Sequence, residues 1–213
     1  MQFMKKTLTL ASILLIAGLT ASAQDKSAGR IKYLVTMNLH LSLKPEQQQF
    51  KDLIPETATQ EAVLLYKGQR FKTWLTTDTI KNDDNSGSST AIHINSGNGE
   101  FLYADVDKGL QWSKKNGKFK ESPLDVKKDR IVPADGTKQI LGFECHKLLS
   151  IADKKDTTIV WYTNELPLKA GSIFNVLTDK GVVLEVEHKK ISYVATEISY
   201  EPVKEEEVTP AGH

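Results

Sequence analysis

The chain has 213 residues and a formal net charge of +1, with 28 basic and 27 acidic side chains. These charges are interspersed, which excludes a basic stripe for nucleic acid and an acidic tract for metal storage. Cys145 is the only cysteine, so an internal disulfide is excluded and the hydrophobic core must supply the stability.

The first 23 residues have the layout of a secretory signal peptide. Lys5 and Lys6 precede an apolar run over residues 8–19, and the A-S-A triplet at 21–23 provides a cleavage site. The run is shorter than the roughly 20 residues of a membrane-spanning helix, although an uncleaved anchor is the alternative. We expect a signal peptide (1–23), one β-rich domain (24–203) and a C-terminal tail (204–213). The protein should therefore be exported, to the periplasm or to the outer membrane.

The clearest periodic pattern follows the signal peptide. Period-two alternation predicts a long strand with one buried and one solvated face. Pro45 ends this strand and begins a predicted short helix over residues 45–54, which Pro55 stops. The apolar residues at every second position are Ile31, Tyr33, Val35, Met37, Leu39, Leu41 and Leu43.

The rest of the chain alternates between strand-like runs and turn signals. Lys67-Gly68 and Asn116-Gly117 predict hairpins, and consecutive strands without crossover helices favour an antiparallel sheet. About ten strands in one sheet tend to curl. We therefore predict a mainly β fold: a curved antiparallel sheet or incomplete barrel, with one or two short helices on its concave face. A two-sheet sandwich is the alternative. The predicted strands are 62–66, 70–77, 91–95, 100–106, 110–113, 118–121, 142–151, 157–163, 181–186 and 191–200.

A series of short motifs occupies the C-terminal half. Residues 140–147 read ILGFECHK, residues 157–167 read TTIVWYTNELP, and Phe174 precedes GVVLEV at 181–186. This order resembles a secreted domain family of unknown function from Gram-negative bacteria, which is related to the GLPGLI family. Where the GLPGLI motif would fall, residues 175–181 read NVLTDKG. The resemblance implies a lipoprotein-carrier (LolA-like) architecture, with helix packed on the concave face of an incomplete barrel.

No catalytic, cofactor or metal-binding motif stands out. The sequence contains no nucleotide-binding, metalloprotease or nucleophile-elbow pattern, and its five histidines form no i, i+4 pair. Cys145 and His146 would point to opposite faces of a strand and could not easily share one ion. We expect Cys145 to be a buried small hydrophobe, with a reactive or intermolecular thiol as the alternative. The sequence thus predicts no enzyme, no cofactor and no metal site.

Three functional hypotheses remain, of which the sequence favours the first two. In the first, an exported non-enzymatic protein binds a lipid or other hydrophobic ligand in the curved sheet, because a short helix alone cannot cover the apolar face of residues 31–43. In the alternative, an envelope protein contacts an outer-membrane or other exported partner through sheet edges or loops. A hydrolase with an unrecognised active site is a third possibility. The mature chain should have no nucleic-acid partner and no membrane span. The residues predicted to line the ligand cavity or core are Met37, Leu39, Leu41, Phe71 and Leu75.

Overall fold

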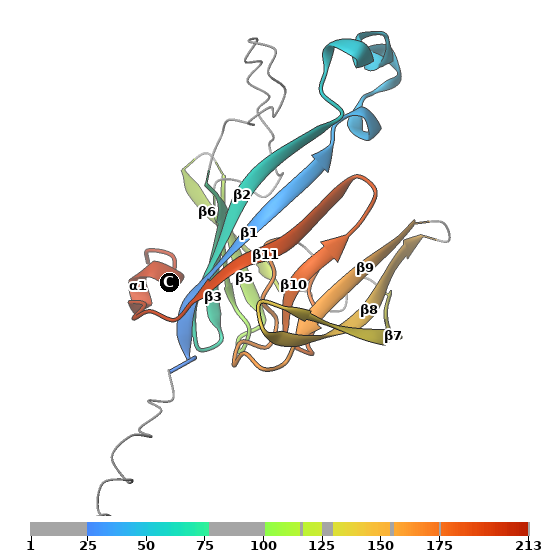
Figure 1. The fold of residues 1–213 in the computed structure, drawn as a ribbon. Coiled ribbons are helices and arrows are strands. Elements are labelled where there is room, and N and C mark those ends of the chain that lie inside the picture. Colours follow the sequence, from blue (N-terminus) through green and yellow to red (C-terminus); the bar gives the residue numbers. More distant parts are fainter. Residues whose placement is uncertain are drawn as a thin grey trace, which may run out of the picture.

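A computed structural model describes residues 25–76, 101–115, 117–124, 130–153, 156–174 and 176–212. Within these ranges one antiparallel sheet has the strand order β6-β5-β4-β3-β2-β1-β11-β10-β9-β8-β7 (Figure 1). The predicted signal peptide and the predicted strand at 91–95 lie outside the described residues. The strands are β1 (Ala28–Asn38), β2 (Thr57–Lys67), β3 (Arg70–Leu75), β4 (Leu102–Asp105), β5 (Leu110–Lys115), β6 (Lys118–Pro123), β7 (Arg130–Ile140), β8 (Phe143–Asp153), β9 (Asp156–Thr163), β10 (Val182–Glu187) and β11 (Ile191–Ser199).

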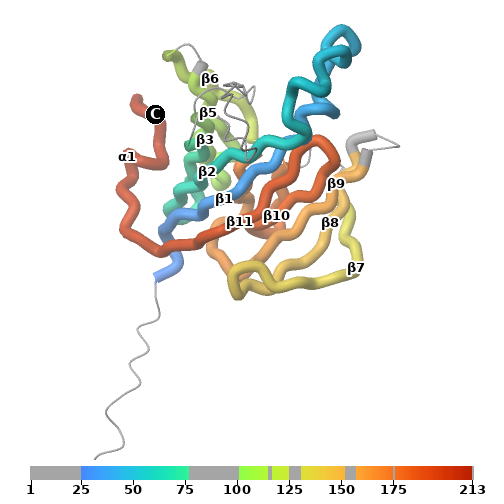
Figure 2. The backbone as a smooth tube through the Cα atoms, turned by 45° about the horizontal axis from the view of Figure 1, so that its top comes forward, coloured from blue at the N-terminus to red at the C-terminus, as the bar shows by residue number. Residues whose placement is uncertain are grey.

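The sheet is open, and this confirms the predicted mainly β, antiparallel fold class. Figure 2 shows the strands following one another from β6 at one edge to β7 at the other. Because all eleven strands of the described residues belong to one sheet, the alternative of a two-sheet sandwich is wrong. The described helices are the 3-10 helices η1 (His40–Ser42) and η2 (Pro45–Leu53) and the short α1 (Glu205–Val208). None of them has the length and hydrophobicity that a membrane crossing requires.

β1 lies at the centre of the sheet and pairs with β2 and β11. Buried and more exposed side chains alternate along β1 as predicted, and Ile31, Tyr33 and Val35 are fully buried. The strand ends at Asn38, earlier than the sequence pattern indicates, because the Asn38 side chain accepts a hydrogen bond from the backbone N–H of Leu41 (3.0 Å). Such local side-chain bonds compete with strand pairing. The pattern of apolar residues therefore runs past the end of the strand.

The core covers one side of the sheet, which we call the inner face. It combines the buried side of β1 with Leu64 and Tyr66 of β2 and Phe71 of β3. The Tyr33 hydroxyl donates a hydrogen bond to the carbonyl of Val183 on β10 (3.0 Å). This bond gives the buried Tyr33 hydroxyl a partner and joins both halves of the sheet.

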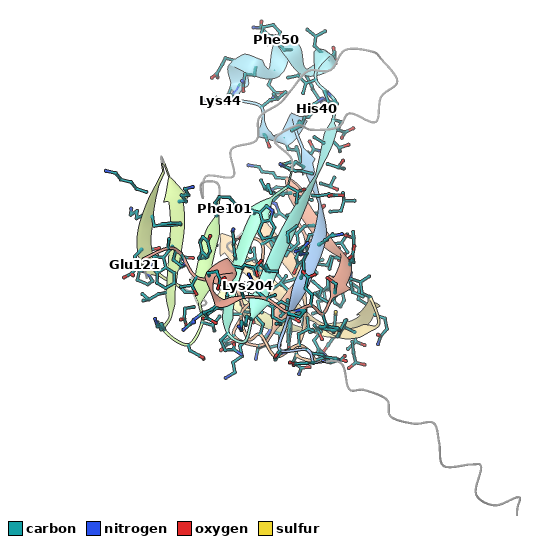
Figure 3. The ribbon with its side chains drawn as sticks, turned by 90° about the vertical axis from the view of Figure 1, so that its left-hand side faces the viewer. His40, Lys44, Phe50, Phe101, Glu121 and Lys204 are labelled. Carbon is teal, nitrogen blue, oxygen red and sulfur yellow. The ribbon has the colours of Figure 1, made fainter. Side chains whose placement is uncertain are left out.

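The predicted helix at 45–54 does not cover the concave face. It forms η2, none of whose residues is buried, at the far end of the β1–β2 projection (Figures 1 and 3). Its sequence PEQQQFKDL contains only Phe50 and Leu53 as large apolar residues, too few for an apolar stripe. The connection between β9 and β10 fills the inner face instead. Its buried apolar residues are Leu166, Leu168, Ala170, Ile173 and Leu177.

Gln69, in the turn between β2 and β3, fixes this connection in place. Its side-chain N–H donates to the carbonyl of Pro167 (2.6 Å), and its side-chain oxygen accepts from the backbone N–H of Lys169 (3.0 Å). One amide therefore joins two segments that are about 100 positions apart in the sequence.

The C-terminal segment, residues 203–210, packs on the opposite, outer face. Val203 and Val208 are buried against Leu65 of β2, with Trp74 of β3 beside them. α1 contacts β2 and β3. The outer face is therefore partly covered by the end of the chain, and the part that this segment leaves open forms the site described next.

Candidate functional site

Of the five residues predicted to line a ligand cavity or the core, four belong to the core or pack against it. Met37, Leu39 and Phe71 are buried in the core, and Leu75 packs partly buried against it. Leu41 lies in η1 and is 48% exposed. None of the five lines either of the two cavities described below.

A polar cleft lies on the outer face, at the end of the sheet where β2 turns into β3 and β4 into β5. Register places Arg70 of β3 opposite Asp105 of β4, and α1 brings Glu205 over them. The cleft has a volume of about 370 Å³, within the range of small-molecule sites. We call it the polar cleft; its lining residues are Lys67, Gly68, Gln69, Arg70, Asp105, Asp107, Lys108 and Glu205.

A second cavity of about 150 Å³ adjoins the polar cleft and shares Arg70, Asp105, Lys108 and Glu205 with it. The rest of its lining is more apolar than that of the polar cleft and includes the largely buried ring of Trp112 on β5. The indole N–H of Trp112 donates to a carboxylate oxygen of Glu121 on β6 (2.9 Å). The two cavities together thus combine a charged rim with an aromatic wall. The other members of this lining are Ala104, Val208, Thr209 and Pro210.

Asp105 is the most buried charged residue of the cleft, with a side chain only 7% exposed. Burial by itself would raise its pKa. The backbone N–H of Lys108 (3.0 Å) and the Arg70 guanidinium (2.9 Å) donate hydrogen bonds to its two oxygens, and they outweigh burial. The pKa of Asp105 therefore lies below its ordinary value of 3.8, and the carboxylate stays ionised at neutral pH.

Glu205 connects α1 to the sheet through ion pairs. It contacts the Arg70 guanidinium, and its other oxygen lies 3.8 Å from the ammonium of Lys67. Outside the cleft, Arg30 of β1 pairs with Glu201 at 3.0 Å. Such half-exposed pairs each contribute little stability, so their main effect is to orient the C-terminal segment over the cleft.

The chemistry of the cleft suits recognition of a polar ligand. Three cationic and three acidic side chains line it together with one amide, so donors and acceptors lie close together. Its lining contains no histidine, cysteine, serine or threonine, and its titratable groups are three carboxylates, two lysines and one arginine. Across the described ranges, no group of three His, Cys, Asp or Glu residues is placed to hold a metal ion.

The sequence analysis did not find this site. Arg70 and Asp105 are 35 positions apart, and Glu205 belongs to a segment that we expected to be a tail. The only local signal was the alternation in β3, where Arg70 and Lys72 flank the buried Phe71. Strand pairing brings these residues together, and pairing depends on contacts between distant segments.

The fold and the cleft define a class: a single-sheet antiparallel β domain with a polar outer cleft. The chain belongs to the family described as the N-glycanase peptide, N-terminal domain (PNGase F-II), whose model matches residues 47–210. This match overturns the resemblance to the secreted family of unknown function and its lipoprotein-carrier architecture. The motifs at 140–147 and 157–167 are short, and they lie in a turn and in paired strands, features that unrelated antiparallel sheets share.

Solved structures show the same fold. Two structures of PNGF-II, in space groups C2 and P21, align with TM-scores of 0.53 and 0.51 and sequence identities of 17%. The alignments cover 84% and 86% of this chain but only 28% and 30% of the PNGF-II chains. The chain therefore spans less than a third of their length. No curated protein matches the chain.

Proposed function

We propose that the chain is an exported, non-enzymatic recognition domain that binds the glycan of a glycoprotein partner in the polar cleft. The observation that carries this proposal is the cleft itself, where charged donors and acceptors adjoin an aromatic wall. The family name supports the choice of ligand, because it is that of N-glycanases.

The chemistry of sugars supports this choice. Each sugar hydroxyl both donates and accepts hydrogen bonds, and the cleft offers carboxylates beside guanidinium and ammonium groups. The apolar face of a sugar ring could pack against Trp112 in the adjoining cavity. A volume of about 370 Å³ suits one or two sugar units.

The packing of the inner face favours this interaction hypothesis over a hydrophobic carrier. Tyr33, Leu64 and Phe71 on the sheet and Leu168 on the β9–β10 connection are all completely buried. Side chains of the protein itself occupy the space that a lipid would need. The partner in our proposal is therefore an exported glycoprotein that approaches the outer face.

The proposal can be tested by calorimetric titration with a neutral biantennary N-glycan linked to asparagine. The protein should bind this probe, and the double variant Asp107→Ala/Lys108→Ala should weaken binding about tenfold, because it removes two charged contacts from the rim. The double variant Asp179→Ala/Lys180→Ala is the matched control, since it removes an exposed Asp-Lys pair between β9 and β10.

The control should bind like the unchanged protein. Absence of measurable binding at millimolar glycan would reject the proposal, as would equal losses in the cleft variant and in the control.

A further inference from the structure

A group of aromatic rings and lysines lies on the outer face beside the polar cleft. We call it the aromatic–lysine surface, and it spans β3 to β6. Figure 3 looks at this side of the molecule, with Phe101 above Lys204 of the C-terminal segment. Apart from the buried Tyr103, these side chains are partly exposed. Its members are Lys72, Trp74, Phe101, Tyr103, Lys114 and Phe119.

Lys72 is at the centre of this surface. Its ammonium lies 4.3 Å from the ring centre of Phe101, 5.2 Å from that of Tyr103 and 5.3 Å from that of Trp74. The ammonium of Lys114 lies 5.6 Å from the same Phe101 ring. Two positive charges therefore converge on one aromatic ring.

Among the described residues, no carboxylate forms an ion pair with Lys72. Lys32, Lys67 and Lys138 each lie within 4 Å of an acidic side chain, whereas Lys72 makes only ring contacts among the residues that the structure describes. A ring quadrupole attracts a cation but leaves its net charge in place. This surface is therefore complementary to an anionic ligand that also has an apolar face.

Lys72 and the polar cleft lie on the same face of β3. Arg70 and Lys72 are two residues apart, which on a strand means roughly 7 Å. Their partners on β4, Asp105 and Tyr103, are likewise two residues apart. A glycan held in the cleft would therefore bring its next sugar unit to the aromatic–lysine surface.

We infer that this surface is a second subsite, which binds a carboxylated sugar of the glycan held in the polar cleft. The sugar carboxylate accepts hydrogen bonds from the Lys72 ammonium, and the apolar ring face packs on Phe101 and Trp74. This inference rests on the proposed function, because the cleft must hold the neutral part of the same glycan.

The test uses two probes that differ only in the carboxylate: a biantennary N-glycan with terminal sialic acid and the same glycan without it. The protein should bind the sialylated glycan about threefold to fivefold more tightly, as expected for one half-exposed ion pair. Lys72→Gln should abolish this preference and leave the affinity for the neutral glycan unchanged. Lys72→Arg should retain the preference, since it keeps the charge.

Lys120→Gln, on the exposed edge strand β6, is the matched control and should retain the preference. For the unchanged protein, the preference should decrease as salt is raised, because salt screens a half-exposed pair. Equal affinity for both probes, or a preference that survives in Lys72→Gln, would overturn this inference and leave the cleft proposal intact. Failure to bind either probe would overturn both.

Discussion

Asp105 illustrates how a single residue depends on its surroundings. Its carboxylate is almost fully buried, yet its pKa lies below 3.8 because Lys108 and Arg70 donate to its oxygens. A carboxyl whose pKa is lowered by folding stabilises the folded state above its unfolded pKa. That stabilisation is lost as the pH falls through the folded pKa.

We predict that Asp105→Asn lowers the free energy of unfolding by about 1–3 kcal/mol at pH 7, because it weakens charge-assisted hydrogen bonds. The difference in the free energy of unfolding between the variant and the unchanged protein should decrease below about pH 4. Urea unfolding at pH 7 and at pH 3 measures both effects. Asp107→Asn, at an exposed neighbouring position, is the control, and an equal loss in the two variants would contradict the assigned role of Asp105.

Cys145 is fully buried on β8, as expected from the sequence. Burial is the main cause that raises the pKa of its thiol to about 11. Because only the thiolate reacts readily, we predict that a disulfide reagent labels Cys145 at least about tenfold more slowly in the native protein than in urea. Spectrophotometric thiol titration measures both rates. Equal rates at pH 7 would show that Cys145 is accessible in the native protein.

At the scale of elements, the β9–β10 connection takes the place that we predicted for a helix. It fills the inner face, and the side chain of Gln69 fixes it through two hydrogen bonds to Pro167 and Lys169. One amide of the β2–β3 turn therefore adds two hydrogen bonds to the apolar packing of this connection. A substitution in that distant turn should thus loosen the connection.

We predict that Gln69→Ala lowers the free energy of unfolding by about 1–3 kcal/mol, since it removes both bonds. Hydrogen exchange should quicken at the backbone amide of Lys169, which loses its acceptor. Gln49→Ala on the exposed η2 is the control and should change neither measurement. Unchanged exchange at Lys169 in the Gln69 variant would show that core packing alone fixes the connection.

At the scale of the whole molecule, the outer face is completed by the end of the chain. Val203 and Val208 are buried against Leu65, and Glu205 pairs with Arg70 and Lys67. The C-terminal segment is thus part of the folded domain and forms one wall of the cleft.

Removing residues 203–213 should lower the free energy of unfolding by about 2–5 kcal/mol, because two buried valines are lost. Trp74 should become more exposed, which shifts its fluorescence to longer wavelength. Removing only residues 211–213 is the control, since the exposed Ala211 and Gly212 contribute little. If both truncations left stability unchanged, the packing of this segment would not contribute to the fold.

The filled inner face leads to a prediction about the intact protein. In native mass spectrometry, the protein purified from its native cells should have the mass of its polypeptide or of a multimer of it. An added mass of lipid size that is lost on denaturation would instead support the hydrophobic-carrier hypothesis. Leu39→Glu distinguishes the two hypotheses further, because only in a carrier would it reduce lipid uptake in a protein that remains folded.

Several elements could be predicted from local sequence. The alternation over residues 31–37 locates β1, and the predicted hairpins at Lys67-Gly68 and before Lys118 match the pairs β2–β3 and β5–β6. Side chains two apart share a face of a strand, and turn residues set the backbone locally. A helix does form within residues 45–54, but the prediction that it covers the concave face was wrong. Proline signals locate the start of a helix and do not determine which surface the helix packs against.

The sequence by itself determined three features. The buried face of β1 follows from the spacing of apolar residues, the antiparallel β class from consecutive strands without crossover helices, and the burial of Cys145 from the apolar character of a free cysteine. The tertiary structure alone decided that the β9–β10 connection fills the core and that the C-terminal segment packs on β2 and β3. It also decided that Arg70, Asp105 and Glu205 meet in one cleft. Such contacts depend on strand register and on packing between distant segments, and neither leaves a periodic signal in the sequence.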